Sequence, residues 1–396
     1  MPTQIKSART IKSSKNHKPL ALIIIPTYNE SLTIANTLDN LDSIIKPIKD
    51  FKVEVLVFDS QSTDNTVNII KDAQKKYKFL HLREEPKKTG LGSAYIQAMQ
   101  IAMHEFKADI VFEFDADGSH QPKYIPQMLA KIKDGADVVV GSRYIKGGSM
   151  PKDWAFHRKL LSWGGNIVAK CVLLTNKYKD LTSGFRATKT SFLKKVALNK
   201  LLSKDYAYKI HLFWELHELK AKIVELPIEF IDREQGESKL PRNGIIDSLR
   251  VVFTIRIRKL ESYIKMGFIG VFSLLVQLGV FNLLRLEMPV TLATAISVEI
   301  SIILNFILNN LITFRHKRIK KSEKKKLLLK FFIFNFASMG SLFIQMGTVK
   351  LSTFISGRHA LLENIGMIVG VLIGSVVNYF IYSRVIWKDK NRDNKK

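Results

Sequence analysis

The stretch IVFEFDADGSH, residues 110–120, decides how the first part of this chain folds. A short apolar run, 110–114, has the pattern of a buried strand, and Asp115 and Asp117 follow directly at its carboxyl end. Two carboxylates at the tip of a strand suit a hard divalent cation that holds a diphosphate. The motif therefore indicates nucleotide-sugar chemistry at the edge of a sheet.

Strand-like runs alternate with helical patterns on both sides of this motif. Strands are predicted at residues 20–25, 53–58, 79–83, 110–114 and 137–140, and helices at 31–41, 65–76 and 92–106. This alternation predicts an α/β domain with a mostly parallel sheet. Ligands of such sheets bind beyond the carboxyl ends of the strands, which is where the candidate motifs fall.

The composition narrows the class of protein. The chain has 396 residues and a formal net charge of +27, an excess that could serve a nucleic acid or an anionic membrane. The basic residues cluster beside long apolar stretches, so we expect a membrane and no nucleic-acid partner. The single cysteine, Cys171, excludes an internal disulfide and is expected in the core or at an interface. Residues 1–18 are polar and basic, so no secretory signal is expected.

The second part of the chain is dominated by apolar stretches. Spans are predicted at about residues 265–284, 290–314, 328–355 and 361–386, each long enough to cross a hydrocarbon core of about 30 Å. The connection 315–326 and the C-terminus are strongly basic, whereas the other two connections are not. The positive-inside rule therefore predicts a multi-pass membrane protein whose first domain, 315–326 loop and C-terminus are cytoplasmic.

A weak repeat links the spans. Asn305-Phe306 near the end of the second span resembles Asn378-Tyr379 near the end of the fourth. The similarity suggests two duplicated two-helix halves.

Two further stretches, Trp154 to Leu174 and Ile245 to Ile264, have basic residues interleaved with apolar ones at helical spacing. Such a pattern is typical of a helix that lies in the membrane interface. For the second stretch, which leads into a span, we favour this interpretation. For the first, an ordinary helix that covers the domain is an equal alternative.

The pentapeptide Pro26-Thr27-Tyr28-Asn29-Glu30 follows the first strand. Proline fixes the turn, tyrosine offers a flat face and glutamate an acceptor, so the loop can hold a nucleoside. Alone it could also be a plain strand-to-helix turn, with Asn29 or Ser31 capping the helix.

Together with Asp59 at the tip of the second strand and the acidic motif, this loop makes the domain resemble glycosyltransferase family 2, and more closely the polyprenyl-phosphate (dolichol-phosphate) mannose synthases. Matching segments are Pro26–Glu30, Asp59–Asp64, Gly90–Gly92, Asp115–His120, Gly141–Tyr144, Ser183–Arg186 and Gly236–Lys239. The membrane part is similar to the GtrA-type four-helix module. Ser60 and Ser119 depart from the family, which often has a second Asp at the first position and in some members Gln at the second.

The resemblance implies an architecture of five parts. A basic tail, 1–18, precedes a GT-A (Rossmann-like) catalytic domain, 19–240. An amphipathic juxtamembrane helix, 241–263, then leads into a four-span GtrA-like domain, 264–388, and a basic tail, 389–396.

The resemblance also assigns roles to single residues. Guanosine contacts fall on Pro26, Tyr28, Glu30, Phe58 and Asp59. Contacts to the diphosphate and to Mg²⁺ or Mn²⁺ fall on Asp115, Ala116, Asp117 and Ser119, with the metal on Asp115, Asp117 and Ser119. Donor phosphates would also meet Arg233 and Lys239 on a late loop, with Lys209 a further candidate. The acceptor phosphate would be held by Arg143, Arg158 and Ser162.

The implied reaction is metal-dependent, inverting transfer of mannose from GDP-mannose to a polyprenyl or dolichyl monophosphate at the cytoplasmic membrane face, giving a β-linked lipid phosphomannose. A lipid monophosphate is already an anion at neutral pH, so no general base is needed. Asp115, Asp117 and Arg143 would carry the catalysis by aligning the reactants and neutralising charge. Two alternatives stay open: a glucosyltransferase that uses UDP-glucose, and a lipid-sugar flippase or scaffold with a vestigial soluble domain. The Gln-x-x-Arg-Trp motif of processive polysaccharide synthases is absent.

Overall fold

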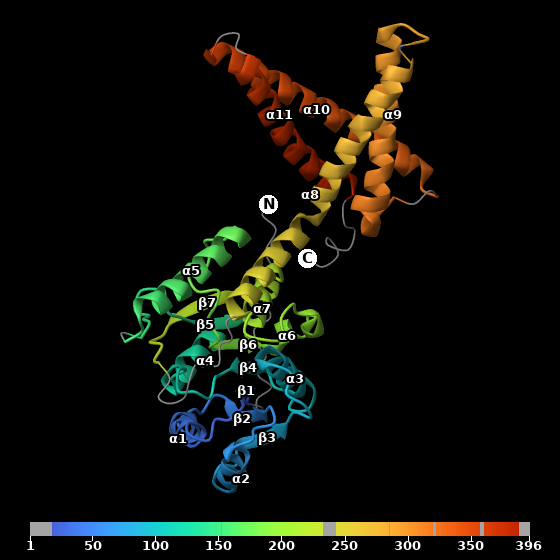
Figure 1. The fold of residues 1–396 in the computed structure, drawn as a ribbon. Helices are drawn as coiled ribbons and strands as arrows, with labels where there is room; N and C mark the ends of the chain where they lie inside the picture. Colours follow the sequence, from blue (N-terminus) through green and yellow to red (C-terminus); the bar gives the residue numbers. More distant parts are fainter. Residues whose placement is uncertain are drawn as a thin grey trace, which may run out of the picture. The chain divides into compact units, whose positions relative to one another are not determined.

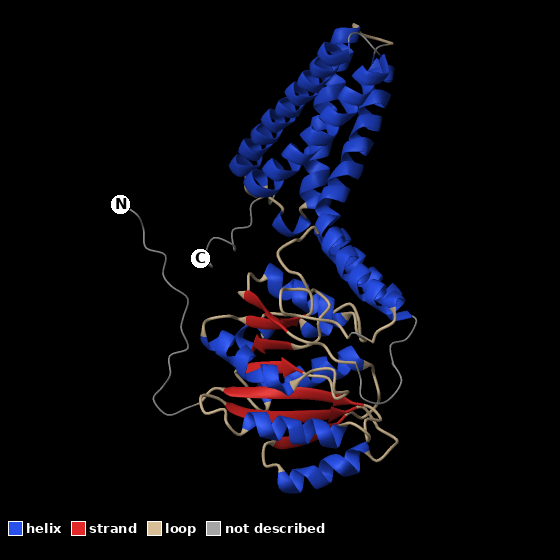
Figure 2. Ribbon diagram, turned by 90° about the vertical axis from the view of Figure 1, so that its left-hand side faces the viewer, coloured by secondary structure: helices blue, strands red, loops and turns tan. Residues whose placement is uncertain are grey.

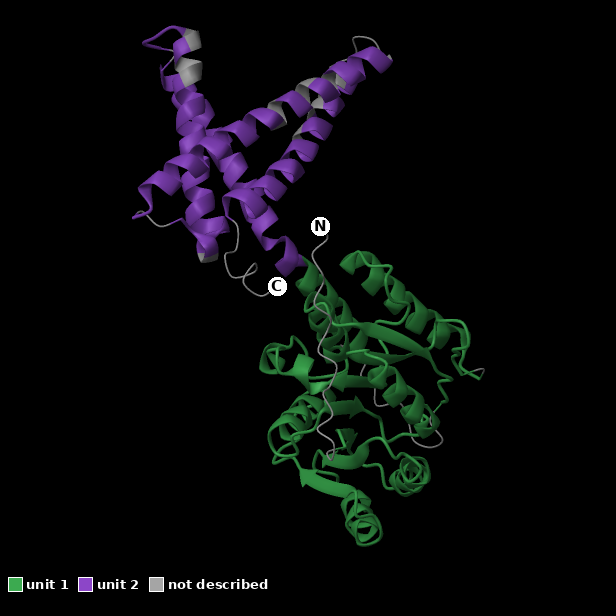
Figure 3. Ribbon diagram, turned by 180° about the vertical axis from the view of Figure 1, so that it is seen from behind, with its two compact units in different colours: residues 1–256 green, residues 257–396 purple. Residues whose placement is uncertain are grey.

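The computed structural model describes residues 18–151, 153–232, 243–284, 286–319, 322–356 and 360–387. They belong to two compact units, residues 1–256 and 257–396 (Figure 3). One long helix, α8 (Asn243–Leu284), begins in the first unit and continues into the second.

The first unit is built on a seven-stranded sheet with the order β3-β2-β1-β4-β6-β5-β7 (Figure 1). The strands are β1 Leu20–Thr27, β2 Lys52–Asp59, β3 Leu80–Glu84, β4 Ile110–Glu113, β5 Val138–Ser142, β6 Arg186–Lys189 and β7 Ile223–Pro227. Only β6 runs antiparallel to its neighbours, so the predicted mostly parallel sheet is confirmed. All the predicted strands are present. The sequence analysis missed β6 and β7, and β6 reads Arg-Ala-Thr-Lys, which has no apolar pattern.

Helices cover both faces of this sheet (Figure 2). Alternate residues of a strand point to opposite faces, and β1 is buried on both. One face packs against α1 (Ile34–Ile45), α2 (Thr66–Lys76) and α4 (Ile125–Lys133). The other packs against α3 (Leu91–His104), α7 (Tyr208–Glu218), the end of α5 (Phe156–Leu173) and the first turns of α8. A short helix, α6 (Thr190–Leu193), and the 3₁₀ turns η1 (Pro122–Tyr124) and η2 (Leu198–Lys200) complete the unit.

Helix α5 covers the domain, as one of the two interpretations of its sequence predicts. Its C-terminal Ala169 and Leu173 pack into the core. Its N-terminal half exposes Phe156, Leu161 and Trp163, and its place in the membrane interface stays a prediction. Cys171, on the same helix, is exposed, so of its two expected positions the core was wrong and an interface stays a prediction.

The second unit contains the rest of α8 and the helices α9 (Val290–Leu308), α10 (Lys324–Ser356) and α11 (Ala360–Ile381). Three stretches of the described residues are long and apolar enough to cross a membrane: Gly244–Leu284, Ile296–Thr313 and Ile368–Ile386. They correspond to the first, second and fourth predicted spans. The third predicted span lies in α10, which is not among them, so four crossings stay a prediction.

The predicted repeat corresponds to two helices that end alike. Helix α9 runs into the π-helix Asn309–Thr313, and α11 runs into the π-helix Tyr382–Ile386. The next residues, Phe314 and Trp387, stack with ring centroids 4.4 Å apart and planes at 8°. The indole N–H of Trp387 donates to Asn310 Oδ1 at 2.8 Å. The two halves are therefore joined where their helices end.

Candidate active site

The acidic motif lies just past the end of β4, and both carboxylates line one large cavity. Asp115 Oδ1 accepts a hydrogen bond of 2.7 Å from the hydroxyl of Tyr95, and Lys209 Nζ lies 3.2 Å from Asp115 Oδ2. Asp117 Oδ1 accepts from the N–H and hydroxyl of Ser119 at 3.1 and 2.6 Å. Each carboxylate is thus oriented by neighbouring donors.

The charges around Asp115 keep it ionised. Burial opposes the anion, but the ammonium of Lys209 and the hydroxyl of Tyr95 together hold the pKa of Asp115 well below its usual range. The side chain of Lys209 is 0 % exposed. Lys209 is therefore buried beside the acidic motif, and its contact with donor phosphates, for which it was a further candidate, stays a prediction.

A buried ion pair between Arg186 and Glu113 holds the backbone of Lys209 in place. Glu113 on β4 and Arg186 on β6 are register partners, and their side chains pair with Arg186 Nε 2.6 Å from Glu113 Oε2. Arg186 Nη1 and Nη2 also donate to the Lys209 carbonyl at 3.4 Å, and the Tyr208 hydroxyl donates to Glu113 Oε1 at 2.6 Å. A Cβ on Gly184 would lie 2.1 Å from Lys209 Nζ, so any side chain at position 184 would have to displace the end of the lysine.

His120 closes the loop that carries the acidic motif. Its Nδ1 accepts from the backbone N–H of Asp115 at 2.9 Å, and its ring stacks on Phe185 at 4.9 Å and 15°. Burial, with Lys209 and Arg143 nearby, lowers the pKa of His120. A neutral imidazole agrees with its role as an acceptor. The sequence signal for His120 was its place directly after the motif.

The donor set fits a hard divalent cation. Asp115 and Asp117 offer carboxylate oxygens, and the Ser119 hydroxyl lies beside Asp117. Within the described ranges, no group of three or more His, Cys, Asp or Glu side chains is placed to hold a metal. Mg²⁺ commonly binds one or two carboxylates and takes its other ligands from water and substrate phosphates. Two carboxylates at the cavity wall therefore suffice.

The residues predicted to contact guanosine lie at the ends of β1 and β2. Pro26 and Phe58 are buried register partners, and Lys88 Nζ lies 3.1 Å from the ring centroid of the half-buried Tyr28. Asp59 is 0 % exposed and accepts hydrogen bonds from Thr27 Oγ1 at 2.8 Å and from Ser62 at 2.8 and 2.6 Å. Its carboxylate organises the loop, and its contact with a nucleoside stays a prediction.

Two other residues predicted to contact the sugar-nucleotide donor, Glu30 and Ala116, lie in nearby loops. Glu30 is half-buried, and its backbone N–H donates to Thr66 Oγ1 at 2.8 Å. The carbonyl of the buried Ala116 accepts from Thr37 Oγ1 at 3.1 Å. Arg233 and Lys239 lie outside the described residues, as does the segment Gly236–Lys239.

The cavity with the acidic motif has a volume of about 540 Å³. All three residues predicted to hold an acceptor phosphate, Arg143, Arg158 and Ser162, line it together with Asp115 and Asp117. Its remaining wall is largely apolar and comes from α5, α7 and the first turns of α8: Leu161, Ala169, Ile210, Ile245, Leu249 and Val252. One cavity therefore contains carboxylates, cationic groups and a largely apolar wall.

The cationic groups are held in different ways. Arg143 is buried and pairs with Asp180, which outweighs the cost of burial and raises the pKa of Arg143. Arg158 is more open, with Nη1 3.0 Å from Asp232 Oδ2 and its guanidinium 4.0 Å from the Trp154 ring centroid. The Ser162 hydroxyl is 2.8 Å from that of Tyr144. The sequence analysis did not single out Asp180.

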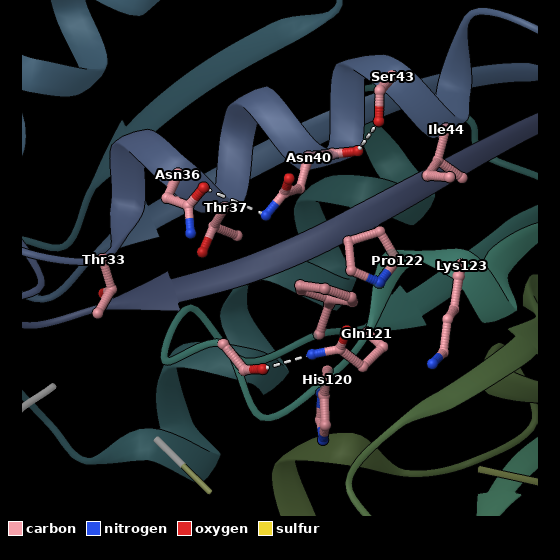
Figure 4. A pocket seen from close by; sticks show the side chains of 12 residues that line it. Thr33, Asn36, Thr37, Asn40, Ser43, Ile44, His120, Gln121, Pro122 and Lys123 are labelled. Atoms are coloured by element: carbon pink, nitrogen blue, oxygen red, sulfur yellow. Dashed lines mark hydrogen bonds between the residues drawn. The ribbon is translucent and has the colours of Figure 1, made fainter. Parts of the chain in front are cut away.

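A second cavity, of about 220 Å³, lies between α1 and the loop that follows the acidic motif (Figure 4). Its walls carry amides and hydroxyls, including Asn36, Thr37 and Asn40 on α1 and Gln121 opposite. Its only charged lining residue is Lys123, which pairs with Glu229 at 3.3 Å. A cavity without carboxylates does not suit a metal-held diphosphate.

Comparison with known proteins agrees with the division of the chain into two units. Residues 22–202 match the glycosyl transferase family 2 domain, and residues 265–387 match the GtrA/DPMS transmembrane domain. A dolichol-phosphate mannosyltransferase of Pyrococcus furiosus is 32% identical over 371 residues, which cover 92% of this chain and 98% of the relative. An undecaprenyl-phosphate mannosyltransferase of Micrococcus luteus is 36% identical over 225 residues, which cover 57% of this chain and 88% of the relative.

The close approach of Gly184 to Lys209 can be tested with a matched control. Gly184→Ala should lower the melting temperature of the full chain, because the new methyl group must displace Lys209 from Asp115 and overpacking typically costs about 1–3 kcal/mol. Gly164→Ala on α5 meets nothing within 4 Å and should leave the melting temperature unchanged or raise it. Equal melting temperatures for the two variants in a thermal-shift assay would contradict this account of Gly184.

Proposed function

Because this chain belongs to the prenyl-phosphate mannosyltransferases, with a family 2 glycosyltransferase domain followed by a GtrA/DPMS transmembrane domain, we propose that it transfers mannose from GDP-mannose to a polyprenyl or dolichyl monophosphate. The single observation that supports the site assignment is the cavity that Asp115 and Asp117 share with Arg143 and an apolar wall. We further propose that the reaction takes place at the cytoplasmic membrane face, since the 315–326 loop is strongly basic.

The acidic end is assigned to the donor. Asp115 and Asp117 would hold Mg²⁺ or Mn²⁺, with Ser119 beside them, and the ion would supply positive charge against the leaving diphosphate. Tyr95 and Lys209 keep Asp115 in one orientation before the donor arrives. Such preorganised charge costs no rearrangement during the reaction. Pro26, Tyr28, Glu30, Phe58 and Asp59 stay the candidates for the nucleoside end, and Arg233 and Lys239 for further phosphate contacts.

The other end of the cavity is assigned to the acceptor. Arg143, Arg158 and Ser162 would bind the lipid phosphate, and the apolar side chains of α5 and α8 would bind the first prenyl units. One phosphate oxygen attacks the anomeric carbon as the bond from that carbon to the diphosphate breaks. The acceptor oxygen is already deprotonated, so the protein needs to align it but not to remove a proton. Attack in line on an α-linked donor gives a β-linked product.

The donor assignment is tested with membranes that contain the full chain. Radiolabelled GDP-mannose and UDP-glucose are supplied separately with polyprenyl phosphate, and label should enter the lipid fraction from GDP-mannose. Asp117→Ala should lower this incorporation about 100-fold or more, because it removes one of two metal-binding carboxylates. The exposed Asp72→Ala serves as a control and should not lower it. Label that enters lipid only from UDP-glucose would contradict the mannose donor, and an unaffected Asp117→Ala variant would contradict the metal site.

The acceptor assignment is tested by two adjacent leucines on α5. Leu161 and Leu160 are 55% and 50% exposed, but only Leu161 lines the cavity. Leu161→Gln should raise the KM for a long polyprenyl phosphate several-fold, because it places an amide where prenyl methyl groups would pack. Burying an amide without a hydrogen-bond partner costs about 1–3 kcal/mol. Leu160→Gln should leave this KM within about twofold. The same KM for both variants would argue that the prenyl chain lies elsewhere.

A further inference from the structure

Arg143 is held by a carboxylate that has no part in the proposed chemistry. Asp180 is 0 % exposed, and its two oxygens face the guanidinium of Arg143. Arg143 Nε donates to Asp180 Oδ2 at 2.8 Å, and Nη2 donates to Oδ1 at 3.0 Å. The backbone N–H of Arg143 adds a third contact to Oδ2 at 3.2 Å. This two-pronged pairing fixes both the position and the plane of the guanidinium.

Asp180 is itself fixed from two sides. The N–H and hydroxyl of Thr182 both donate to Asp180 Oδ1 at 3.1 Å. The backbone N–H groups of Asp180 and Lys179 donate to the two carboxylate oxygens of Glu225 on β7, each at 2.9 Å. Ser142 at the end of β5 donates to Glu225 as well, at 2.8 Å. The chain before Asp180 is thereby tied to two strands of the sheet.

These contacts leave one edge of the guanidinium for a ligand. Nε and Nη2 of Arg143 are taken by Asp180, and Nη2 also donates to Thr182 Oγ1 at 2.8 Å. Among the residues that the structure describes, Nη1 makes no hydrogen bond. Arg143 lines the same cavity as Ser162, Asp115 and the apolar wall.

We propose that Asp180 is a positioning residue that fixes Arg143 so that its remaining N–H groups receive the phosphate of the acceptor. The inference rests on the proposed function and assigns to Asp180 a part in acceptor binding that does not depend on touching the acceptor. A purely structural ion pair would affect donor and acceptor kinetics alike. A positioning residue affects the acceptor alone.

The test is Asp180→Asn in the full chain, purified in detergent. Asparagine places an N–H group where one carboxylate oxygen now accepts from Arg143. Two donors cannot bond to each other, so the guanidinium must leave its present orientation. The KM for polyprenyl phosphate should rise about tenfold or more, as expected when a charge-assisted hydrogen bond is lost, while the KM for GDP-mannose stays within about twofold. Asp137→Asn, which removes a carboxylate paired with Lys189 away from the cavity, is the matched control and should leave both KM values unchanged.

A double-mutant cycle with Arg143→Gln separates positioning from stability. If Asp180 acts through Arg143, adding Asp180→Asn to Arg143→Gln should raise the acceptor KM no further. Additive effects, or an Asp180→Asn variant with an unchanged acceptor KM beside an impaired Arg143→Gln variant, would overturn the inference and leave the proposed function standing. An Arg143→Gln variant with an unchanged acceptor KM would overturn both the inference and the assignment of Arg143 to the acceptor phosphate.

A milder variant keeps the test available if Asp180→Asn does not fold. Thr182→Val removes the hydroxyl that contacts both Asp180 and Arg143 Nη2 but leaves the ion pair. It should raise the acceptor KM in the same direction by a smaller factor, with the KM for GDP-mannose unchanged. A rise in the donor KM alone would contradict the positioning role.

Discussion

The ion pair between Lys209 and Asp115 is the contact on which the site depends. Three features hold the lysine at the acidic motif. Arg186 binds its backbone carbonyl, and Glu113 on the neighbouring strand neutralises Arg186. Gly184 has no side chain to fill the space that the end of the lysine occupies. Breaking a buried pair by removing one partner leaves an uncompensated charge, which is far more costly than losing an exposed pair. The buried ion pairs Lys209–Asp115 and Arg186–Glu113 therefore support the cavity wall. They orient the carboxylate of Asp115 without a ligand.

The cavity combines three kinds of surface that a transfer to a membrane lipid requires. Its lining contains the carboxylates of Asp115 and Asp117, the guanidinium groups of Arg143 and Arg158, and apolar side chains of α5 and α8. A lipid phosphate acceptor would need cations to bind it and no general base to deprotonate it. Helix α8 supplies part of the apolar wall with its first turns and continues into the unit that carries the apolar spans. The apolar wall proposed to bind the prenyl chain and the first candidate span thus share one helix.

Much of this could be predicted from local sequence. The strands that end at Asp59 and Asp115 have apolar patterns. The residues assigned to the acceptor came from the family resemblance, and they line one cavity with the acidic motif. The supporting charges could not be predicted, because a buried Arg186 reads as a surface residue until its partner, 73 positions away, is known. Asp180 was missed for the same reason. The carboxylate of Asp59 accepts hydrogen bonds from its own loop, which the strand pattern could not reveal.

The central claim is that the acceptor's prenyl chain lies in the cavity between α5 and the start of α8, next to the metal-binding motif. Photo-crosslinking tests it most directly, with a polyprenyl phosphate that carries a photoreactive group on its first isoprene unit, followed by mapping of the labelled peptides in the full-length protein. The account predicts label in α5, around Leu161 to Ala169, and in α8, around Ile245 to Val252, with loss of label when excess unmodified polyprenyl phosphate competes. Competable label found only in residues 257–387 would contradict it.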